Sequence, residues 1–446
     1  MTGSDPTNLE AIARRVCEMA GDIEAQALVT RHRYGLTRFA NSFIHQHHGE
    51  DTTKVAVKVA VEGRVASAST TDDSDDGLSR LVDDATTAAL LQPVDVHWPG
   101  VAEPADTPDF EKTSAATIGA QPSDRADGVA AFIDAGTDLS AAGYLDTSFQ
   151  ESAVATTAGQ SASGGATRAI IDGIHRGATS AGNGHQTSVD FSQLDAAAAG
   201  RRAADLARRG TDPIDLQPGE YPVVLSPECV ATIAIFLAGY GFGGQSYVDG
   251  QSFVELGERQ FDESFHLIDD PLDSRVVSLP FDADGTPKRT LPLVEAGVSK
   301  AIAHDRRTAL RAGAESTGHA IPVSYFGPFP TSVVVGAGTS SAQDLIGDVE
   351  RGVYVSTFNY CRILDPRSQV VTGLTRNGTF LVESGEITRP LSNLRFTQSF
   401  LNALGEGSIL GIGNDQRYAD SEFGPGLVIA PSMSLAAWRF TGGAQG

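Results

Sequence analysis

Residues 27–72 read ALVTRHRYGLTRFANSFIHQHHGEDTTKVAVKVAVEGRVASASTTD and contain three runs in which apolar and polar side chains alternate. Such alternation predicts antiparallel strands, because a period of two places the apolar side chains on one face of a sheet. The three runs are residues 27–48, 53–63 and 64–72. Helical spacing of apolar residues at 8–20 and 76–92 predicts a helix on each side of them. This region therefore predicts an α+β fold.

Two stretches rich in proline and acidic residues, 92–114 and 211–221, interrupt the periodicity and are typical of exposed connections. We therefore expect three domains. They are an N-terminal α+β domain at 1–95, a middle α+β domain at 115–212 and a large β-rich C-terminal domain at 220–446.

The middle domain is predicted to contain a helix at 123–143, strands within 147–177 and an alanine-rich helix at 191–210. The C-terminal domain begins with an apolar helical segment, PECVATIAIFLAGY, at 227–240. Glycines follow that segment as GYGFGG. A dinucleotide-binding loop needs a strand before its glycines and a helix after them. Here a helix precedes them and the strand-like run 245–256 follows, so we interpret the glycines as a helix end and a turn.

The composition excludes some partners. The chain has 446 residues and a formal net charge of −23, which repels phosphate backbones and anionic lipids. We therefore expect neither nucleic acid nor membrane as a partner. No apolar run approaches the ~18 residues that span a bilayer, and the first residues lack a secretion signal pattern, so we expect a cytoplasmic protein.

Two residue groups could suggest a metal site. His45, His47, His48 and Glu50 offer imidazole and carboxylate ligands. On a strand, however, His45 and His47 share one face while His48 points to the other, which favours a solvated or peptide-contacting strand end. The three cysteines are widely separated and form no CxxC pair, so buried free thiols are expected. They are Cys17, Cys229 and Cys361. The sequence contains no GxSxG nucleophile elbow.

Five stretches in a fixed order carry a specific resemblance. They are TRFANSFIHQ at 37–46, the stretch beginning LGERQFDESFHLIDD at 256–298, ESTGHA at 315–320, GLTRNGTFLVESGEITRPLSNLRFTQS at 373–399 and the terminal FTGG. Together they resemble the TldD/PmbA family of metallopeptidases from about residue 25 onward. The resemblance implies an N-terminal α/β portion, a middle portion and a β-rich C-terminal domain, in agreement with the two predicted connections.

That family contains TldD-like chains with a zinc-binding HExxxH helix and PmbA-like chains, also called TldE, without it. In HExxxH, two histidines on one helical face bind zinc and the glutamate acts on the metal-bound water. The resemblance aligns Ile235, Phe236 and Tyr240 with the first histidine, the glutamate and the second histidine. Ile and Phe have no lone pair, and a neutral tyrosine is a poor zinc ligand. The resemblance therefore implies a PmbA/TldE-type chain without a catalytic, cofactor or metal site of its own.

The resemblance also implies a further cysteine ligand in TldD-like chains. Its nearest counterpart here is SILGIGND at 408–415, with Leu410 at the aligned position and no cysteine. Residues in segments that resemble family motifs, including AIAHDRRTA at 301–309, are candidates for a peptide cleft, although each is also consistent with a structural, hydrogen-bonded role. They are His304, His319, Arg376 and Asn393, with Asn377 and Arg395 of similar standing.

These observations predict a subunit that pairs, as a heterodimer or larger assembly, with a TldD-like zinc subunit and acts on unfolded peptides. Zinc is expected in the partner and no cofactor in this chain. One alternative is a homo-oligomeric peptide-binding or regulatory protein without proteolytic activity. Another is an independent hydrolase with unrecognised residues.

Overall fold

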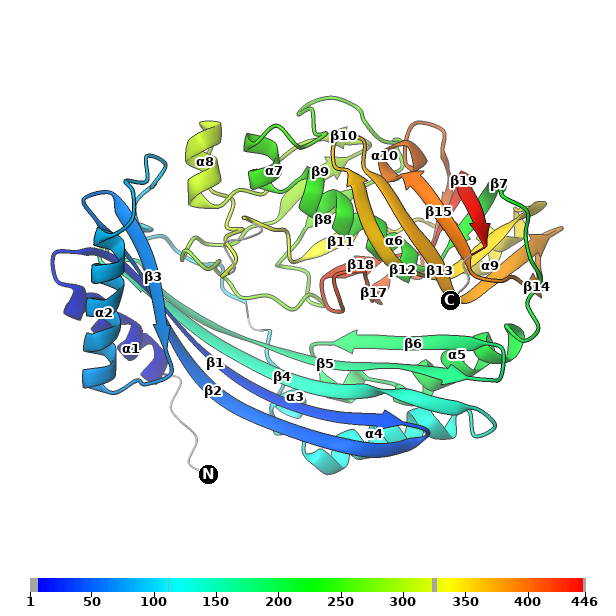
Figure 1. Ribbon diagram of the computed structural model, residues 1–446, viewed down its shortest axis with the longest axis horizontal. Helices are drawn as coiled ribbons and strands as arrows, with labels where there is room; N and C mark the ends of the chain where they lie inside the picture. Colours follow the sequence, from blue (N-terminus) through cyan, green and yellow to red (C-terminus); the bar gives the residue numbers. More distant parts are fainter. Residues whose placement is uncertain (1–6, 111, 323–326, 444–446) are drawn as a thin grey trace.

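The chain has an α+β fold in which a β-rich C-terminal part lies over one face of a long curved sheet (Figure 1). This confirms the predicted fold class. The computed structural model describes residues 7–110, 112–322 and 327–443. Within those ranges, no helix combines the length and the apolar character needed to cross a lipid bilayer.

The long sheet contains six antiparallel strands in the order β3-β2-β1-β4-β5-β6. They are β1 (Glu24–Ala40), β2 (Phe43–Val61), β3 (Arg64–Thr70), β4 (Ser140–Thr156), β5 (Ser161–Arg176) and β6 (Ala181–Ser188). β1 pairs with β4 from Gln26–Thr156 to Phe39–Gly143. The three-domain division remains a prediction, but this ladder crosses the predicted boundary between 1–95 and 115–212.

Helices cover the face of the sheet that points away from the C-terminal part (Figure 1). They are α1 (Thr7–Ala20), α2 (Asp75–Leu90), α3 (Ala115–Gly119), α4 (Pro122–Asp134) and α5 (Ala196–Arg209), with a 3₁₀ turn, η1 (Phe191–Gln193). Odd-numbered β1 residues such as Ala27 and Val29 pack into the core beneath α1 and α2. Because side chains alternate along a strand, the even-numbered residues, including Thr30 and His32, face the C-terminal part.

The structure corrects three predicted elements. The helix predicted at 123–143 ends at Asp134, and residues 140–143 already belong to β4. β2 runs without a break through the histidine-rich stretch, because β1 pairs with it along its whole length, including Tyr34 with Glu50 and Gly35 with Gly49. The predicted run 27–48 is divided by a turn at Asn41 and Ser42, and the exposed histidines lie near the start of β2. The run predicted as a strand at 245–256 instead begins with the short helix α7 (Gly244–Val248) and continues as coil.

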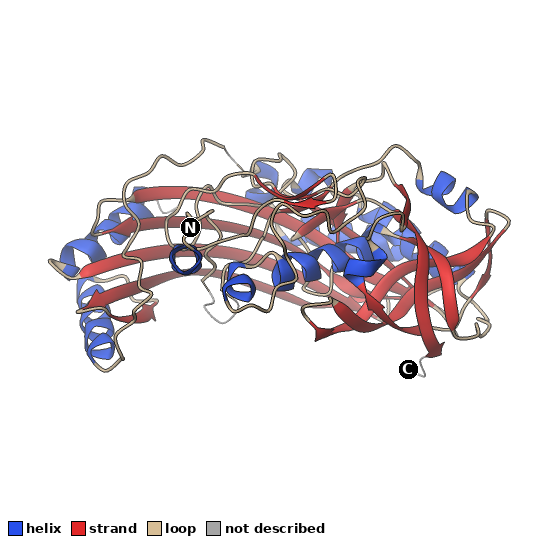
Figure 2. Cartoon of the chain, turned by 90° about the horizontal axis from the view of Figure 1, so that it is seen from above, coloured by secondary structure: helices blue, strands red, loops and turns tan. Residues whose placement is uncertain are grey.

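The C-terminal part contains two sheets (Figure 2). One has the order β12-β7-β19-β15-β13-β14, and an added β12–β13 pairing closes five of these strands into a ring. Its strands are β7 (Gly219–Leu225), β12 (Arg351–Asp365), β13 (Val370–Glu383), β14 (Glu386–Pro390), β15 (Leu394–Ser399) and β19 (Met433–Gly443), with β16 (Ile409–Ile412) beside β19.

The second sheet has the order β10-β9-β8-β11-β18-β17. Its strands are β8 (Leu267–Asp269), β9 (Leu291–Glu295), β10 (Val298–Ser299), β11 (Val333–Val335), β17 (Arg417–Ala419) and β18 (Val428–Ala430). The helices of this part are α6 (Pro227–Phe236), α7, α8 (Arg306–Ala312), α9 (Ala342–Gly347) and α10 (Phe400–Ala403). α6 contacts strands of both sheets, including β12 and β18, and so lies in the core.

Candidate functional site

Helix α6 is the segment that the family resemblance aligns with a zinc helix. Every one of its ten residues is buried. Pro227 starts the helix at a position where its missing N–H costs nothing. Beyond Phe236 the chain makes a π-helical turn, η2 (Leu237–Gly241), and Phe242 N–H donates to Leu237 O at 3.0 Å. The predicted helix and its glycine-rich end are both present.

The three aligned side chains lie in an apolar environment. Ile235 has no exposed surface and Phe236 is 1% exposed. The Phe236 ring lies 5.2 Å from Phe423, 5.6 Å from Tyr240 and 5.8 Å from Phe400, between ring centroids. We call Phe236, Tyr240, Phe329, Phe400 and Phe423 the aromatic cluster, since Phe329 also contacts Phe423.

These residues do not fit zinc. Ile235 and Phe236 offer no donor atom, and the aromatic cluster provides neither imidazole nor carboxylate. Leu410, at the position aligned with the cysteine ligand, is 60% exposed on β16. In the part of the chain that the structure describes, no three His, Cys, Asp or Glu side chains are grouped to hold a metal ion.

The first turn of the same helix carries a buried charge. Glu228 accepts hydrogen bonds from Arg417 Nη1 and Nη2 at 2.8 and 3.0 Å and from Arg202 Nη2 at 2.8 Å. Burial alone would raise the pKa of Glu228, but the two guanidinium groups outweigh it and lower the pKa. Arg202 belongs to α5, beneath the long sheet, so this carboxylate joins the two parts of the molecule.

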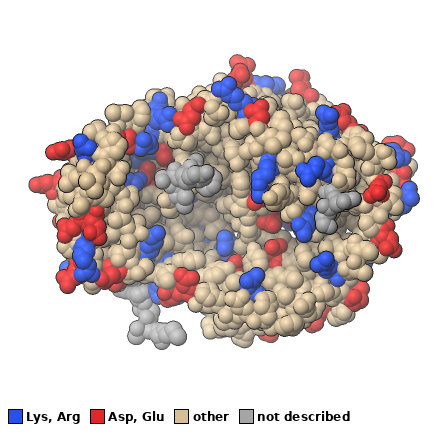
Figure 3. Space-filling view, in the orientation of Figure 1, with Lys and Arg blue, Asp and Glu red and all other residues tan. Residues whose placement is uncertain are grey.

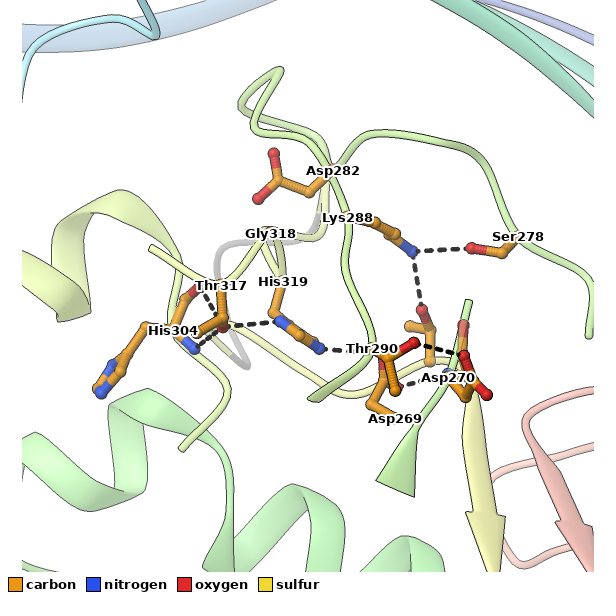
Figure 4. Close-up of polar contacts among 12 residues, drawn as sticks. Asp269, Asp270, Ser278, Asp282, Lys288, Thr290, His304, Thr317, Gly318 and His319 are labelled. Carbon is orange, nitrogen blue, oxygen red and sulfur yellow. Dashed lines mark hydrogen bonds and ion pairs between the residues drawn. The ribbon is translucent and has the colours of Figure 1, made fainter. Parts of the chain in front are cut away.

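His304 and His319 come together around Thr317 (Figure 4). The His304 backbone N–H donates to Thr317 Oγ1 at 2.7 Å, and Thr317 Oγ1 lies 2.8 Å from His319 Nδ1. His319 Nε2 lies 3.0 Å from Asp269 Oδ2. Because a carboxylate only accepts, Nε2 carries a proton. The Thr317 hydroxyl has one proton, which it can donate either to His319 Nδ1 or to the His304 carbonyl oxygen at 3.1 Å.

Burial limits what this arrangement can do. Asp269, His319 and Thr317 are 1%, 3% and 6% exposed. Burial would raise the pKa of Asp269, but the interaction with His319 lowers it. An Asp–His–hydroxyl series can support nucleophilic catalysis, yet this hydroxyl already accepts the His304 N–H and does not face a cleft. We interpret the series as a link that fixes residues 315–320, and a peptide-cleft role for the two histidines stays a prediction.

Arg376 and Asn393 lie elsewhere, on the wall of a polar cleft of about 600 Å³. We call it the asparagine cleft. It lies between β5 and β6 of the long sheet and β12 and β13 of the C-terminal part, and its polar lining includes Asp172, Arg176, Asn183, Asn359, Arg376, Asn377, Asn393 and Asp420. Arg376 Nη1 donates to Asn359 Oδ1 at 3.0 Å. The structure thus brings together two of the four candidate residues and separates them from the histidine pair.

A second cleft, of about 320 Å³, lies between the polar face of the long sheet and the C-terminal part. The molecule is hollowed where these two parts meet (Figure 3). We call it the lysine cleft, since Lys288 lines it with Arg168, His32 and Asp282. The remaining polar lining residues are Thr30, Ser148, Gln150, Ser152, Ser278 and Thr331. Ala320, next to His319, also belongs to its wall.

The exposed histidines of β2 form no such site. His48 Nε2 lies 3.7 Å from Glu50 Oε2, and both side chains are about half exposed. All three cysteines are free. Cys229 and Cys361 are buried as predicted, whereas Cys17 is half-buried.

Sequence reasoning missed Glu228, Asp269 and Lys288. A signal existed for Glu228, because a single carboxylate within the apolar run 227–240 must find a partner when that run is buried. The partner of Asp269, His319, is 50 residues away in sequence. No local signal predicts that pairing.

The C-terminal part is that of a metallopeptidase-type C-terminal domain. Residues 218–442 match the PmbA/TldA metallopeptidase C-terminal domain, which covers half of the chain. The chain therefore belongs to the PmbA/TldD family.

Individual relatives agree with this assignment. A metalloprotease of Methanothermobacter thermautotrophicus is 28% identical over 229 residues, which are 49% of this chain and 48% of the relative. A metalloprotease TldD homolog of Buchnera aphidicola is 27% identical over 199 residues, 43% of this chain and 41% of its own. The chain spans about half the length of the curated relatives it matches.

Solved structures extend the likeness to the whole fold. TldE from Thermococcus kodakarensis superimposes with a TM-score of 0.86 over 97% of this chain and 99% of its own, at 20% sequence identity. At that identity the likeness describes the fold alone.

Proposed function

We propose that this chain is the non-catalytic, PmbA/TldE-like subunit of a two-component zinc peptidase that cleaves unfolded peptides. A TldD-like partner supplies the metal and activates the water, and the assembly is a heterodimer or larger. One observation carries the proposal. The segment that the resemblance aligns with a zinc helix is helical, as α6 and η2, but its aligned positions hold the packed side chains of Ile235, Phe236 and Tyr240.

The contribution of this chain would be to bind and orient the peptide. The side chains of Asn359, Asn377 and Asn393 each offer a carbonyl acceptor and an amide donor, and Arg376 offers donors only. An extended peptide presents the complementary groups along its backbone, whereas a folded segment has already paired them. The asparagine cleft therefore suits chains without stable structure.

The proposal is tested by co-purification with a TldD-like protein from the same genome, followed by zinc analysis and a peptide-cleavage assay. We expect a stable complex, zinc bound in it, and cleavage that requires both chains. Chelation or mutation of the partner's HExxxH should abolish cleavage. Failure of the two proteins to associate, or full cleavage by this chain alone, would refute the proposal.

A second measurement tests the asparagine cleft within that complex. Arg376→Ala and Asn393→Ala should raise the KM for an unfolded peptide about tenfold or less, as expected for losing one hydrogen-bonding side chain each. The matched control is Arg389→Ala, an exposed arginine on β14 outside the cleft. An unchanged KM in both cleft variants would assign peptide binding to another surface.

A further inference from the structure

Lysine is rare in this acidic chain, and its placement is uneven. We call residues 270–290, which join β8 to β9, the docking loop. Of the five lysines of the chain, two contact this loop and a third belongs to it. Lys58 Nζ lies 2.7 Å from Asp284 Oδ1, and Lys112 Nζ donates to the Leu272 and Asp273 carbonyls. Lys288 belongs to the loop itself. Two lysines of the N-terminal region therefore fix the loop, which leaves the third on the wall of the lysine cleft.

The walls of that cleft are held rigidly. Gln26 Nε2 donates to Ala283 O at 2.7 Å, and Gln160 Nε2 donates to Gly285 O at 2.9 Å. Gly164 on β5 permits close contact, since a Cβ there would lie 2.5 Å from the Pro280 ring. A cleft whose walls are fixed in this way loses little entropy when a ligand enters it.

The two basic side chains on the cleft wall lack a close carboxylate partner in the described part of the chain. Burial lowers the pKa of Lys288, and the charges of Asp269 and Asp282 oppose that shift from beyond contact distance. Lys288 Nζ contacts only hydroxyls, Ser278 Oγ at 3.4 Å and Thr331 Oγ1 at 3.2 Å (Figure 4). Among the described residues, no carboxylate lies within ion-pair distance of it. Arg168 Nη2 is 3.8 Å from Asp146 Oδ2, and the buried Arg168 Nε has no hydrogen-bond partner in the described part of the chain.

Among the described residues that line the cleft, Asp282 is the one carboxyl, and it does not cancel these charges. Asp282 accepts backbone N–H groups from Asp284, Thr286 and Ala320 at 2.9 Å each. Burial, together with the nearby charge of Asp284, raises the pKa of Asp282 to about 7. Near neutral pH its charge is therefore partial and already solvated by backbone dipoles.

We propose that the lysine cleft binds a carboxylate that carries a short apolar group. Lys288 and Arg168 are the ionic partners of the carboxylate, and Leu28, Phe281 and Ile321 provide the apolar wall. The volume of about 320 Å³ lies at the small end of ligand sites and suits one or two amino-acid residues. The site goes beyond the proposed function, because it uses this chain alone and requires neither a partner subunit nor a metal.

Two sources offer this chemistry, a free small carboxylate and the C-terminus of a peptide. Calorimetric titration of the full chain would compare acetyl-leucine, acetyl-Ala-Ala-Leu with a free carboxylate, and the same tripeptide as its C-terminal amide. We expect the free tripeptide to bind at least tenfold more tightly than the amide. Equal binding of acetyl-leucine would identify small carboxylates as ligands, and binding of the tripeptide alone would identify peptide ends.

Variants test the assigned residues. Arg168→Gln and Lys288→Met should each weaken binding at least tenfold, while Lys300→Met, which removes a surface lysine paired with Glu295, should not change it. Thermal melting would check that each variant folds. If Lys288→Met does not fold, the affinity of Arg168→Gln alone tests the proposal. Equal affinity for acid and amide, unaffected variants, or no binding at millimolar ligand would each overturn the proposal.

Discussion

Helix α6 is ten residues long, and it buries a charged side chain at one end and an aromatic side chain at the other. The first turn holds the Glu228 carboxylate between two arginines, and the last turn places Phe236 among aromatic rings. Both ends are almost fully buried. The charged end needs partners from α5 and β17, because a buried charge without partners is costly, whereas the apolar end needs only well-packed neighbours.

This difference separates two roles within α6, which are holding the helix in position and presenting side chains at its other end. The position of α6 is fixed from its charged end, which joins the long sheet to the C-terminal part through Arg202 and Arg417. The apolar end is then not required to carry polar groups for the fold. Under the proposed function, a chain of this kind could keep the helix while Ile235, Phe236 and Tyr240 stand at the positions that the resemblance aligns with zinc-binding side chains.

The largest expected effect comes from the charged end. Glu228→Gln leaves Arg202 and Arg417 without their carboxylate, and losing one partner of a buried ion pair costs about 3–5 kcal/mol. Denaturant unfolding would measure the free energy of unfolding. The control is Glu383→Gln, which removes a half-exposed partner of Arg351 at 3.3 Å and should cost less than about 1 kcal/mol. Equal losses in the two variants would mean that Glu228 does not hold the helix.

A substitution at the apolar end is expected to lower the free energy of unfolding slightly less. Phe236→Ala removes a ring that contacts three others, and such a cavity costs about 3 kcal/mol or more. Tyr240→Phe keeps the ring and serves as the control, with a change below about 1 kcal/mol expected. A small loss in Phe236→Ala would show that the aromatic cluster is loosely packed, and would weaken the contrast with the charged end.

Sequence patterns predicted individual helices and strands better than they predicted which strands pair with each other. Alternation in 27–72 and the apolar run at 227–240 predicted strands and a helix that the structure contains, since both patterns are local. The pairing of β1 with β4 joins residues more than 100 positions apart, and no periodicity encodes it. β6 was not predicted, because its sequence AGNGHQTS is poor in strand formers. Its glycines instead allow close packing, and a Cβ at Gly184 would lie 1.9 Å from Ala199 O.

The candidate site was predicted unevenly for the same reason. The family resemblance located Ile235, Phe236 and Tyr240, but the aromatic rings around them come from residues up to 423. Arg376 and Asn393 share a cleft because the strands that carry them lie near one another. His304 and His319 were predicted as members of the same peptide cleft. The structure instead places both histidines around the buried Thr317, away from the asparagine cleft.

The buried carboxyl of Asp282 differs from that of Glu228 in how its charge is stabilised, and the two should therefore affect stability differently as pH changes. Glu228 has two arginines and a lowered pKa, so its stabilisation is present above the unfolded pKa and is lost as pH falls. Asp282 has no guanidinium partner within the described ranges, and its pKa is raised to about 7 by burial and by Asp284. Its contribution to stability is therefore full below the unfolded pKa of about 4 and is lost as pH rises to about 7.

Unfolding measured from pH 4 to 8 would test this sign. Asp282 should contribute a slope of at most about −1.4 kcal/mol per pH unit, and Asp282→Asn should remove it. The asparagine will also lower stability at every pH, since it accepts fewer backbone N–H groups, so the slope and not the level is the readout. Asp205→Asn, an exposed carboxyl on α5, is the control. An unchanged slope in Asp282→Asn would contradict the assignment.

The smallest expected effect is that of zinc on the isolated chain. A ligand that binds only the folded state at 100 times its Kd stabilises it by about 2.7 kcal/mol, which a thermal melt detects readily. Because the apolar end of α6 offers no donor set, 100 µM zinc should shift Tm by less than about 1 °C, and a chelator should have no effect. A combined His45→Ala and His47→Ala variant would identify weak binding by the exposed histidines of β2. A shift of several degrees that survives in that variant but disappears in Tyr240→Phe would place a metal at the apolar end, and the contrast between the two ends of α6 would no longer hold.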